Sequence, residues 1–310
     1  MSARQTTNTI FMVRPVAFRM NEQTAVNNYF QKNLTDEDVN EQAQQEFDAF
    51  VTKLRNVGVQ VIVVDDKIED DTPDSIFPNN WVSFHETGEI ALYPMFAENR
   101  RKERRLEYFA KLEEEGFKIT EIVDYTSAEE ENLFLEGTGN LILDRKHQKA
   151  YCALSPRAEE DLLIEFCEDF EFTPVIFQAN QSVNEERKPI YHTNVMMCMA
   201  EEFAIICLDA IDDKKERKNV INHLKEDGKE VIVITEEQMH EFAGNMLQVE
   251  GKDKSKYLVM SARARRSLSE EQIEKIEEHC DILSSELKVI EICGGGSARC
   301  MMAEVFLPRA

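Results

Sequence analysis

The sequence predicts an α/β fold, a five-bladed propeller formed by a single domain over residues 1–310. Three observations lead to this prediction. The order strand–strand–helix–strand occurs five times, no linker rich in Pro or Ser divides the chain, and a polar or reactive residue opens each hairpin at nearly constant spacing. One such unit cannot bury an apolar face alone. Five units packed in a ring can, with the helices outside and the first strands around a central channel.

The first unit is expected to combine the two ends of the chain. A strand within residues 8–18 should pair with a strand within residues 298–308, because both segments are rich in apolar residues. A helix over residues 41–58, with apolar residues at helical spacing, and a strand over residues 59–66 complete this unit. The pairing of the two termini would close the ring.

The other four units follow in order along the chain. Each is expected to be a hairpin that turns at polar residues, then a charged helix, then a short apolar strand. They cover residues 80–124, 139–178, 192–235 and 244–293, and their last strands are expected at FKITEIVDY, FTPVIFQ, KEVIVIT and LKVIEIC. The helix of the first of these four units is expected to run through NRRKERRLEYFAKLEEEG.

The residues that open the hairpins give a geometric prediction. They are Asn80, Glu136, His192, Asn245 and Cys300, and their successive spacings are 56, 56, 53 and 55 residues. Equivalent positions in a pseudo-symmetric ring lie around one axis. We therefore expect these five side chains to converge at one mouth of the channel.

Charge and composition exclude several classes of function. Sixty acidic residues against 36 basic ones give a net charge of −24, which repels nucleic acids and anionic membrane surfaces. No stretch approaches the roughly 18 consecutive apolar residues of a membrane-spanning helix, and the N-terminal residues lack the pattern of a signal peptide. The expectation is a soluble cytoplasmic protein whose acidic surface aids solubility or, alternatively, attracts a cationic substrate.

Cysteine and histidine usage gives no sign of a metal site. The seven cysteines are odd in number and contain no CxxC pair, and the six histidines show no HxH or HExxH spacing. We expect neither a disulfide framework nor a metal, and nothing in the sequence indicates another cofactor.

Three of the hairpin-opening residues have the chemistry of a nucleophilic enzyme. Cys300 follows the run GGGSAR, where Arg299 and free backbone N–H groups can lower a thiol pKa. Taken alone, Cys300 is equally compatible with a buried cysteine in a turn before a strand, and His192 with a core histidine. Together with the carboxylate of Glu136 they form a nucleophile, a base and a group that orients the base.

Several short motifs occur in order on this repeat. DSIFPNN matches the pattern D/N-x-x-F-x-x-D, EGTGN is similar to EGGD, HTN is similar to HxD, ALSPRA is similar to G-x-S/E-R-T, and GGGSARCM ends in the cysteine. These motifs resemble those of the guanidino-group-modifying superfamily, which contains arginine deiminases, dimethylarginine dimethylaminohydrolases and amidinotransferases. The resemblance covers nearly the whole chain and implies a pentein-like five-bladed α/β propeller.

The resemblance also assigns roles to individual residues. Cys300, His192 and Glu136 would be catalytic, and the substrate would be contacted by Asp74, Phe77, Asn80, Asn194, Arg157 and Arg101. Arg157 would hold the α-carboxylate of an amino-acid substrate. The segment NRRKE resembles an arginine-bearing motif in which Arg100 is the alternative to Arg101, and the additional Thr138 in EGTGN leaves the alignment of Asn140 open.

Two departures from the family pattern bear on the substrate. Arginine deiminases pair the cationic guanidinium with two aspartates, whereas this sequence has Asn80 and Asn194 at the aligned positions. An amide offers one donor group and one acceptor, which suits a neutral ureido group. The implied activity is hydrolysis at the ureido carbon of citrulline, giving ornithine, ammonia and carbon dioxide.

Two other interpretations stay open. The enzyme would be an arginine deiminase or a dimethylarginine dimethylaminohydrolase if another acid, such as Asp74, pairs with a guanidinium. A propeller that only binds a ligand is the alternative of another class, although such a protein has no evident need for the three catalytic residues. The expected partner is a small amino-acid substrate, and assembly into a homo-oligomer is left open.

Overall fold

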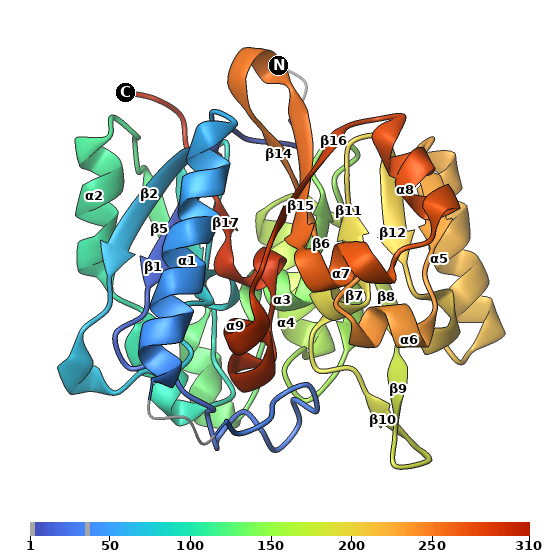
Figure 1. The fold of residues 1–310 in the computed structure, drawn as a ribbon, viewed down its shortest axis with the longest axis horizontal. Helices are drawn as coiled ribbons and strands as arrows, with labels where there is room; N and C mark the ends of the chain where they lie inside the picture. The colour runs from blue at the N-terminus through green and yellow to red at the C-terminus, as the bar shows by residue number, and fades with distance from the viewer. Residues whose placement is uncertain (1–3, 35–37) are drawn as a thin grey trace.

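Five three-stranded sheets make up the framework of the protein. The computed structural model describes residues 4–34 and 38–310 (Figure 1). In each sheet the middle strand pairs antiparallel with one neighbour and parallel with the other. The sheets comprise β17 (Ala303–Glu304), β1 (Thr9–Arg14) and β2 (Gln60–Asp65); β3 (Val82–Phe84), β4 (Glu89–Leu92) and β5 (Glu121–Asp124); β6 (Ile142–Asp144), β7 (Lys149–Leu154) and β8 (Thr173–Gln178); β11 (Met197–Met199), β12 (Phe203–Ile206) and β13 (Glu230–Val233); β14 (Leu247–Glu250), β15 (Lys256–Ser261) and β16 (Asp281–Ser285).

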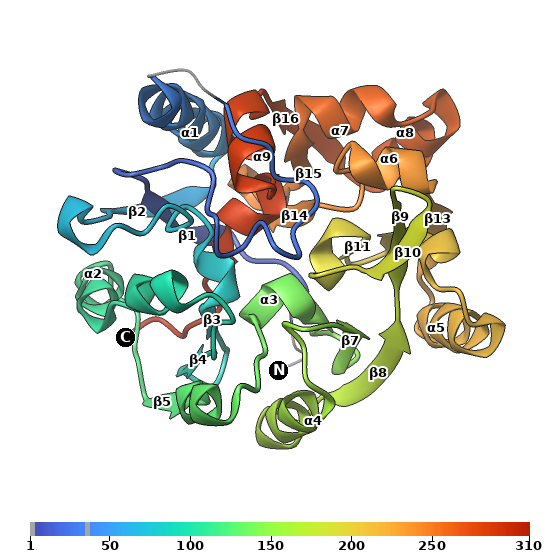
Figure 2. The ribbon, with the colours of Figure 1, turned by 90° about the horizontal axis from the view of Figure 1, so that it is seen from below.

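In each sheet, the connection between the two parallel strands contains one or two helices. These connections contain α1 (Val39–Asn56), α2 (Phe109–Glu114), α4 (Glu160–Asp169), α5 (Lys214–Glu226), and α7 (Ala262–Ser267) with α8 (Glu270–Glu277). Figure 2 shows the units following one another around the molecule in chain order, with these helices on the outside. Further elements are α3 (Gly137–Asn140), α6 (Glu236–His240), α9 (Lys288–Gly294) and a projecting hairpin of β9 (Asn180–Val183) and β10 (Glu186–Pro189). The predicted mixed α/β organisation is confirmed.

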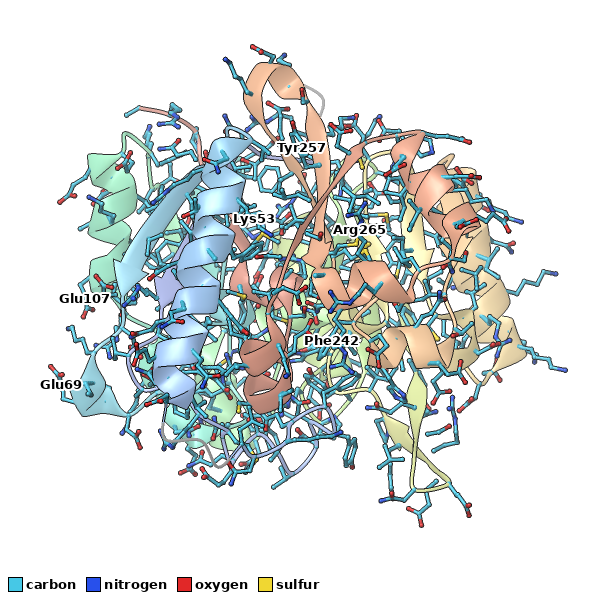
Figure 3. All side chains as sticks on the ribbon, in the orientation of Figure 1. Lys53, Glu69, Glu107, Phe242, Tyr257 and Arg265 are labelled. Carbon is cyan, nitrogen blue, oxygen red and sulfur yellow. The ribbon has the colours of Figure 1, made fainter. Side chains whose placement is uncertain are left out.

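The predicted pairing of the two chain ends is also present. Ile10 of β1 lies opposite Glu304 of β17, and Phe11 lies opposite Ala303. Helix α1 covers this sheet through Phe47, Phe50 and Leu54, which are almost fully buried. On the solvent side of α1, Lys53 donates a hydrogen bond of 2.7 Å to the carbonyl oxygen of Ser284 in β16, so the helix also ties the first unit to the last (Figure 3).

Two expected elements differ from the structure. The charged segment after β4 is not one helix: it forms 3₁₀ turns at Glu98–Glu103 and Leu106–Tyr108 before the short α2. Residues at i and i+3 of a 3₁₀ helix lie above one another, and this turn directs both Arg100 and Glu103 into the interior. The buried ion pair explains why the segment leaves the α-helical path.

The second difference concerns the last strand of the fifth unit. LKVIEIC is not that strand; it forms α9, and the strand is the preceding Asp281–Ser285. A short apolar run does not distinguish a strand from a helix. Gly295, whose φ of +62° suits a helix C-terminus, ends α9 just before the turn that carries Cys300. Among the described residues, no helix has the length and apolar character needed to span a membrane.

The packing of the first sheet against the second should depend strongly on Phe11. Its ring packs edge-to-face on Trp81 and Phe84 and lies 6.3 Å from Tyr108, so it joins the first sheet to the second. We expect Phe11→Ala to lower the free energy of unfolding by about 3–5 kcal/mol, with Phe11→Leu costing clearly less. Equilibrium denaturation in urea measures both, and a loss below about 1 kcal/mol for the alanine variant would contradict this packing.

Candidate active site

Asn245 lies two residues before β14, and the other four hairpin-opening residues lie in or next to short helical turns that precede the first strands of their sheets. These turns are Pro78–Asn80, α3, Thr193–Val195 and Ala298–Met301. Close packing between them requires glycine: a Cβ on Gly137 would lie 2.4 Å from the carbonyl oxygen of Asn79. A Cβ on Gly139 would lie 2.5 Å from Asn80 Nδ2 and 2.9 Å from His192 Nδ1. The glycines of EGTGN therefore bring the Asn80 and His192 side chains to one place.

Glu136 and His192 form the strongest contact of the site. His192 Nε2 lies 2.6 Å from Glu136 Oε2, and both side chains are buried. The second carboxylate oxygen of Glu136 accepts a hydrogen bond of 2.9 Å from the backbone N–H of Phe96. The structure thus brings Glu136 into the orienting position that the sequence predicts.

Burial and neighbouring charges set the protonation states. Burial alone would raise the pKa of Glu136, but the charge of Arg157 and the contact with His192 hold that pKa well below its usual range. Burial lowers the pKa of His192 to about 4, despite the opposing effect of Glu136. Burial also raises the pKa of Cys300 above its ordinary value. Near neutral pH the resting site therefore holds a carboxylate, a neutral imidazole and a thiol.

Two asparagine amides point their donor groups at Cys300. Asn245 Nδ2 lies 3.2 Å and Asn194 Nδ2 3.5 Å from Cys300 Sγ. The backbone N–H of Arg299 donates to Asn245 Oδ1 at 3.0 Å, and Asn245 Nδ2 lies 3.3 Å from Asn194 Oδ1. Because an N–H can only donate, this chain of contacts directs both amide nitrogens toward the sulfur, and the thiol in turn can donate to Asn194 Oδ1 at 3.8 Å. Two such donors favour the thiolate over the thiol.

Asn245 is the site residue whose role was not predicted from the sequence. Its spacing from the other hairpin-opening residues placed it at the channel mouth, but an asparagine has no reactivity that would suggest a function. Asn194 was expected to contact the substrate, and the structure places its amide beside Cys300.

A small cavity with a volume of about 10 Å³ lies beside these residues. Its lining includes Cys300, His192, Asp74, Phe77, Asn80 and Arg157. It also includes Arg100, which is 2% exposed and forms hydrogen bonds of 2.9 and 3.0 Å to both carboxylate oxygens of Glu103. Arg101 lies outside: it contacts the carbonyl oxygen of Met95 and the carboxylate of Glu129. The expected position of Arg101 is thus corrected to Arg100, because the 3₁₀ turn directs Arg100 inward.

Arg100 fixes the orientation of Asn80. Arg100 Nη1 donates to Asn80 Oδ1 at 2.9 Å, so the amide oxygen faces the guanidinium. Asn80 Nδ2 is buried without a hydrogen-bond partner within residues 4–34 and 38–310. Asn80, which lines the cavity, therefore has a donor group without a partner among the described residues.

Asp74 has a carboxylate oxygen that accepts no hydrogen bond from the described residues. Its Oδ2 accepts hydrogen bonds from Asn21 Nδ2 at 2.8 Å and Thr24 Oγ1 at 3.0 Å, while its Oδ1 has no partner in the described part of the chain. Burial raises the pKa of this carboxyl, and the charge of Arg100 opposes that shift. Oδ1 can accept an N–H from a ligand.

The segment that contains Thr24 also covers Arg157. Arg157 Nη1 lies 3.3 Å from Glu136 Oε2, Nη2 donates to the carbonyl oxygen of Thr24, and Nε and Nη2 both contact Asn27 Oδ1. Asn28 Nδ2 lies 3.3 Å from the carbonyl oxygen of Gly295. The Asn27 oxygen occupies the place on Arg157 that a substrate carboxylate would take, so binding in the expected manner requires this segment to shift.

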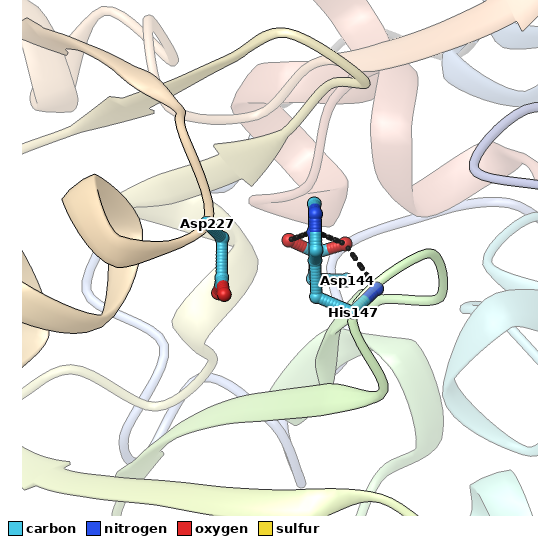
Figure 4. Close-up of side chains that lie close together, drawn as sticks. All are labelled: Asp144, His147 and Asp227. Atoms are coloured by element: carbon cyan, nitrogen blue, oxygen red, sulfur yellow. Dashed lines mark hydrogen bonds and ion pairs between the residues drawn. The ribbon is translucent and has the colours of Figure 1, made fainter.

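One cluster elsewhere has ligand types found in metal sites. Asp144, His147 and Asp227 lie close together, and His147 Nδ1 is 2.9 Å from Asp144 Oδ2 (Figure 4). Lysine ammonium groups already neutralise both carboxylates: Lys229 Nζ lies 3.1 Å from Asp144, and Lys149 Nζ lies 2.7 Å from Asp227. The geometry is that of an ion-pair cluster.

Comparison with known proteins agrees with the motifs. A family model described as "N,N dimethylarginine dimethylhydrolase, eukaryotic" matches residues 14–307. The chain belongs to this family. The resemblance to guanidino-group-modifying enzymes is therefore confirmed. A search of curated protein sequences finds no match.

Solved structures with the same fold are distant in sequence. ArgZ, an arginine dihydrolase from the ornithine-ammonia cycle in cyanobacteria, is similar with a TM-score of 0.74 and 18% identity, over 97% of this chain and 41% of ArgZ. The chain thus spans about two fifths of that protein. The N-terminal domain of ArgZ, solved as a mutant bound to substrate, gives a TM-score of 0.71 at 18% identity, over 96% of this chain and 99% of that domain. A dimethylarginine dimethylaminohydrolase adduct gives 0.64 at 15% identity, with coverages of 96% and 98%.

Asn245 should control the ionisation of Cys300. Removing a donor to the thiolate costs about 1.5–3 kcal/mol, so Asn245→Ala should raise the Cys300 pKa by about 1–2 units. Because the thiolate is the species that reacts, alkylation of Cys300 by iodoacetamide at pH 8 should slow by about tenfold or more, with the pH profile displaced upward. Mass spectrometry of the Cys300 peptide gives the rate.

Asn180→Ala on the projecting hairpin serves as the matched control, because it removes a half-buried amide that donates to Asp212 and lies far along the chain from Cys300. Equal alkylation profiles for wild type and Asn245→Ala would show that this amide does not stabilise the thiolate.

Proposed function

We propose that the protein is a cysteine-dependent hydrolase of the C–N bonds at the ureido or guanidino carbon of an arginine-related amino acid. The observation that carries this proposal is the joint lining of one cavity by Cys300 and by His192, whose ring is held by Glu136. The amide donors at the sulfur support a thiolate nucleophile. We also infer that the five sheets are the blades of a single propeller over residues 1–310 and that the enzyme works in the cytoplasm.

The reaction would proceed through a covalent intermediate. His192 takes the proton of Cys300, and the sulfur attacks the ureido carbon of citrulline to form a tetrahedral oxyanion. Collapse breaks the bond to the side-chain nitrogen, which leaves as the amine of ornithine after His192 returns the proton. Water, activated by His192, then cleaves the S-carbamoyl bond and frees Cys300. The released carbamate breaks down to ammonia and carbon dioxide.

Asn80 supports the ureido step in particular. Its buried Nδ2 has no partner in the described residues and can donate to the ureido oxygen, and more strongly to the oxyanion that forms from it. The adjacent Arg100 would repel a guanidinium placed at the same point. These two features favour citrulline.

A second candidate, hydrolysis of a cationic guanidine, is favoured by a specific group. Asp74 Oδ1 is a buried acceptor without a partner in the described chain and can pair with a guanidinium N–H. The family model carries the name of a dimethylarginine hydrolase, and ArgZ is described as an arginine dihydrolase. In this case the sulfur attacks the guanidino carbon, ammonia or dimethylamine leaves, and water releases citrulline.

The deciding experiment incubates the purified protein with citrulline, arginine and dimethylarginine and measures ornithine, citrulline, ammonia and dimethylamine. We expect ornithine from citrulline, and Cys300→Ser should reduce turnover by orders of magnitude while the fold is retained. Retention of more than about a tenth of the rate would refute the covalent mechanism, and absence of turnover of all three substrates would refute the proposed function.

Asn80 provides a test of specificity. In a Cys300→Ser background, Asn80→Asp replaces the donor with an acceptor, so citrulline should bind more weakly and arginine more tightly. The ratio of the two dissociation constants should shift by at least about tenfold, or ~1.4 kcal/mol. Asn80→Ala, which removes the donor without adding charge, separates the two effects. A ratio unchanged within about threefold would show that Asn80 does not select the ligand.

A further inference from the structure

A second hollow lies at the other ends of two strands that begin at the candidate active site. β3 (Val82–Phe84) lies between Asn80 and His85 in the chain, and β6 (Ile142–Asp144) lies between Asn140 and Arg145. A cavity of about 380 Å³, open to solvent, is lined there by residues that include both His85 and Arg145. None of its lining residues also lines the catalytic cavity.

Arg145 is the unusual group of this hollow. It is 6% exposed, and its guanidinium makes no hydrogen bond or ion pair with any described residue. One face of the guanidinium stacks on the ring of Phe306 at 4.0 Å. A buried cation without an anionic partner destabilises a protein, so such a group calls for a function.

Three acids in the surroundings of Arg145 are paired with other cations. Glu304 pairs with Arg299 at 2.7 Å, Glu86 pairs with Arg4 at 3.0 Å, and the adjacent Asp144 pairs with Lys229. Burial lowers the pKa of Arg145, but an arginine remains charged at neutral pH. The hollow therefore contains a cation that is available to a ligand.

Neutral ring side chains form the wall of the hollow, and acidic side chains form its exposed rim. His85 stacks on Phe170 with the ring centroids 3.9 Å apart, and its Nε2 lies 2.8 Å from Ser83 Oγ. Burial lowers the His85 pKa well below its ordinary value, so the imidazole is neutral. The exposed rim carries the carboxylates of Asp169 and Glu171, while the third rim acid, Glu86, is paired with Arg4.

We propose that this hollow is a binding site for a small zwitterion, of which an α-amino acid is the simplest kind, with its carboxylate on Arg145 and its ammonium group at the acidic rim. A simple anion would be repelled by the rim, and a simple cation would be repelled by Arg145. A ligand with both charges satisfies the two parts at once. The site is independent of the proposed catalytic function.

The test combines thermal stability with hydrogen–deuterium exchange. The probes are L-ornithine, L-citrulline and L-glutamine, and propionate and propylamine represent the two halves of a zwitterion. At least one amino acid should raise Tm in proportion to its occupancy and slow exchange in the peptides that contain residues 85–89, 145–148 and 169–172. Exchange identifies the location, so binding at the catalytic cavity is not mistaken for binding here.

Arg145→Gln is the decisive variant. It should abolish protection of these three segments, and it should raise the Tm of the ligand-free protein by about 2 °C or more, because an unpaired buried charge has been removed. Lys146→Gln makes the same charge change at the exposed neighbouring residue and should leave the protection intact. The pairing of higher stability with lost binding distinguishes a ligand site from a structural arginine.

Three outcomes would overturn the proposal. One is protection by none of the amino acids; another is equal protection in wild type and Arg145→Gln. The third is equal protection by propionate, which would show that a carboxylate alone is recognised. Each is independent of turnover, so failure of this proposal and failure of the proposed catalytic function are distinguishable.

Discussion

The carboxylate of Glu136 is the group on which the arrangement of the site depends. It is fully buried, and it is contacted by His192, Arg157 and the backbone N–H of Phe96. An uncompensated carboxylate in such a place would be neutralised or would destabilise the fold. Because four separate segments meet at one charge, the position of each is constrained by the other three, and the imidazole is held in one orientation.

The asparagine amides around the cavity are also held in place by their neighbours, through the direction of their hydrogen bonds. A carboxamide can turn either way, yet each of the three in question is fixed by a group that can only donate. The backbone N–H of Arg299 orients Asn245, Asn245 orients Asn194, and the guanidinium of Arg100 orients Asn80. As a result the sulfur and the cavity both face N–H donors. Carboxylates at these positions would present only acceptors, which is the electrostatic difference between binding a neutral and a cationic ligand.

Much of this organisation could be predicted from the sequence because it repeats. Strand alternation, helix periodicity and the even spacing of the hairpin-opening residues identified the units and brought Asn80, Glu136, His192, Asn245 and Cys300 together. The predictions from sequence are wrong where tertiary contacts, and not the local pattern of residues, determine the structure. LKVIEIC carries no period that separates a strand from a helix, and only its packing beside α1 resolves it as α9. Arg100 and Arg101 are identical in type, and only the buried Glu103 determines which one faces inward.

The functions of residues that act through other residues were the least accessible to sequence reasoning. Asn245 has no reactive group, and its effect on Cys300 exists only because Arg299 orients it. Arg145 occupies a turn of polar residues, DRKHQK, in which burial of one cation is not evident. Both effects depend on which partners the fold leaves available, which is a property of the packed sheets and not of any single segment. In β3 and β6, one end of the strand lies beside the candidate active site and the other end beside the hollow that contains Arg145. One short strand therefore joins Asn80 to His85, and the other joins Asn140 to Arg145.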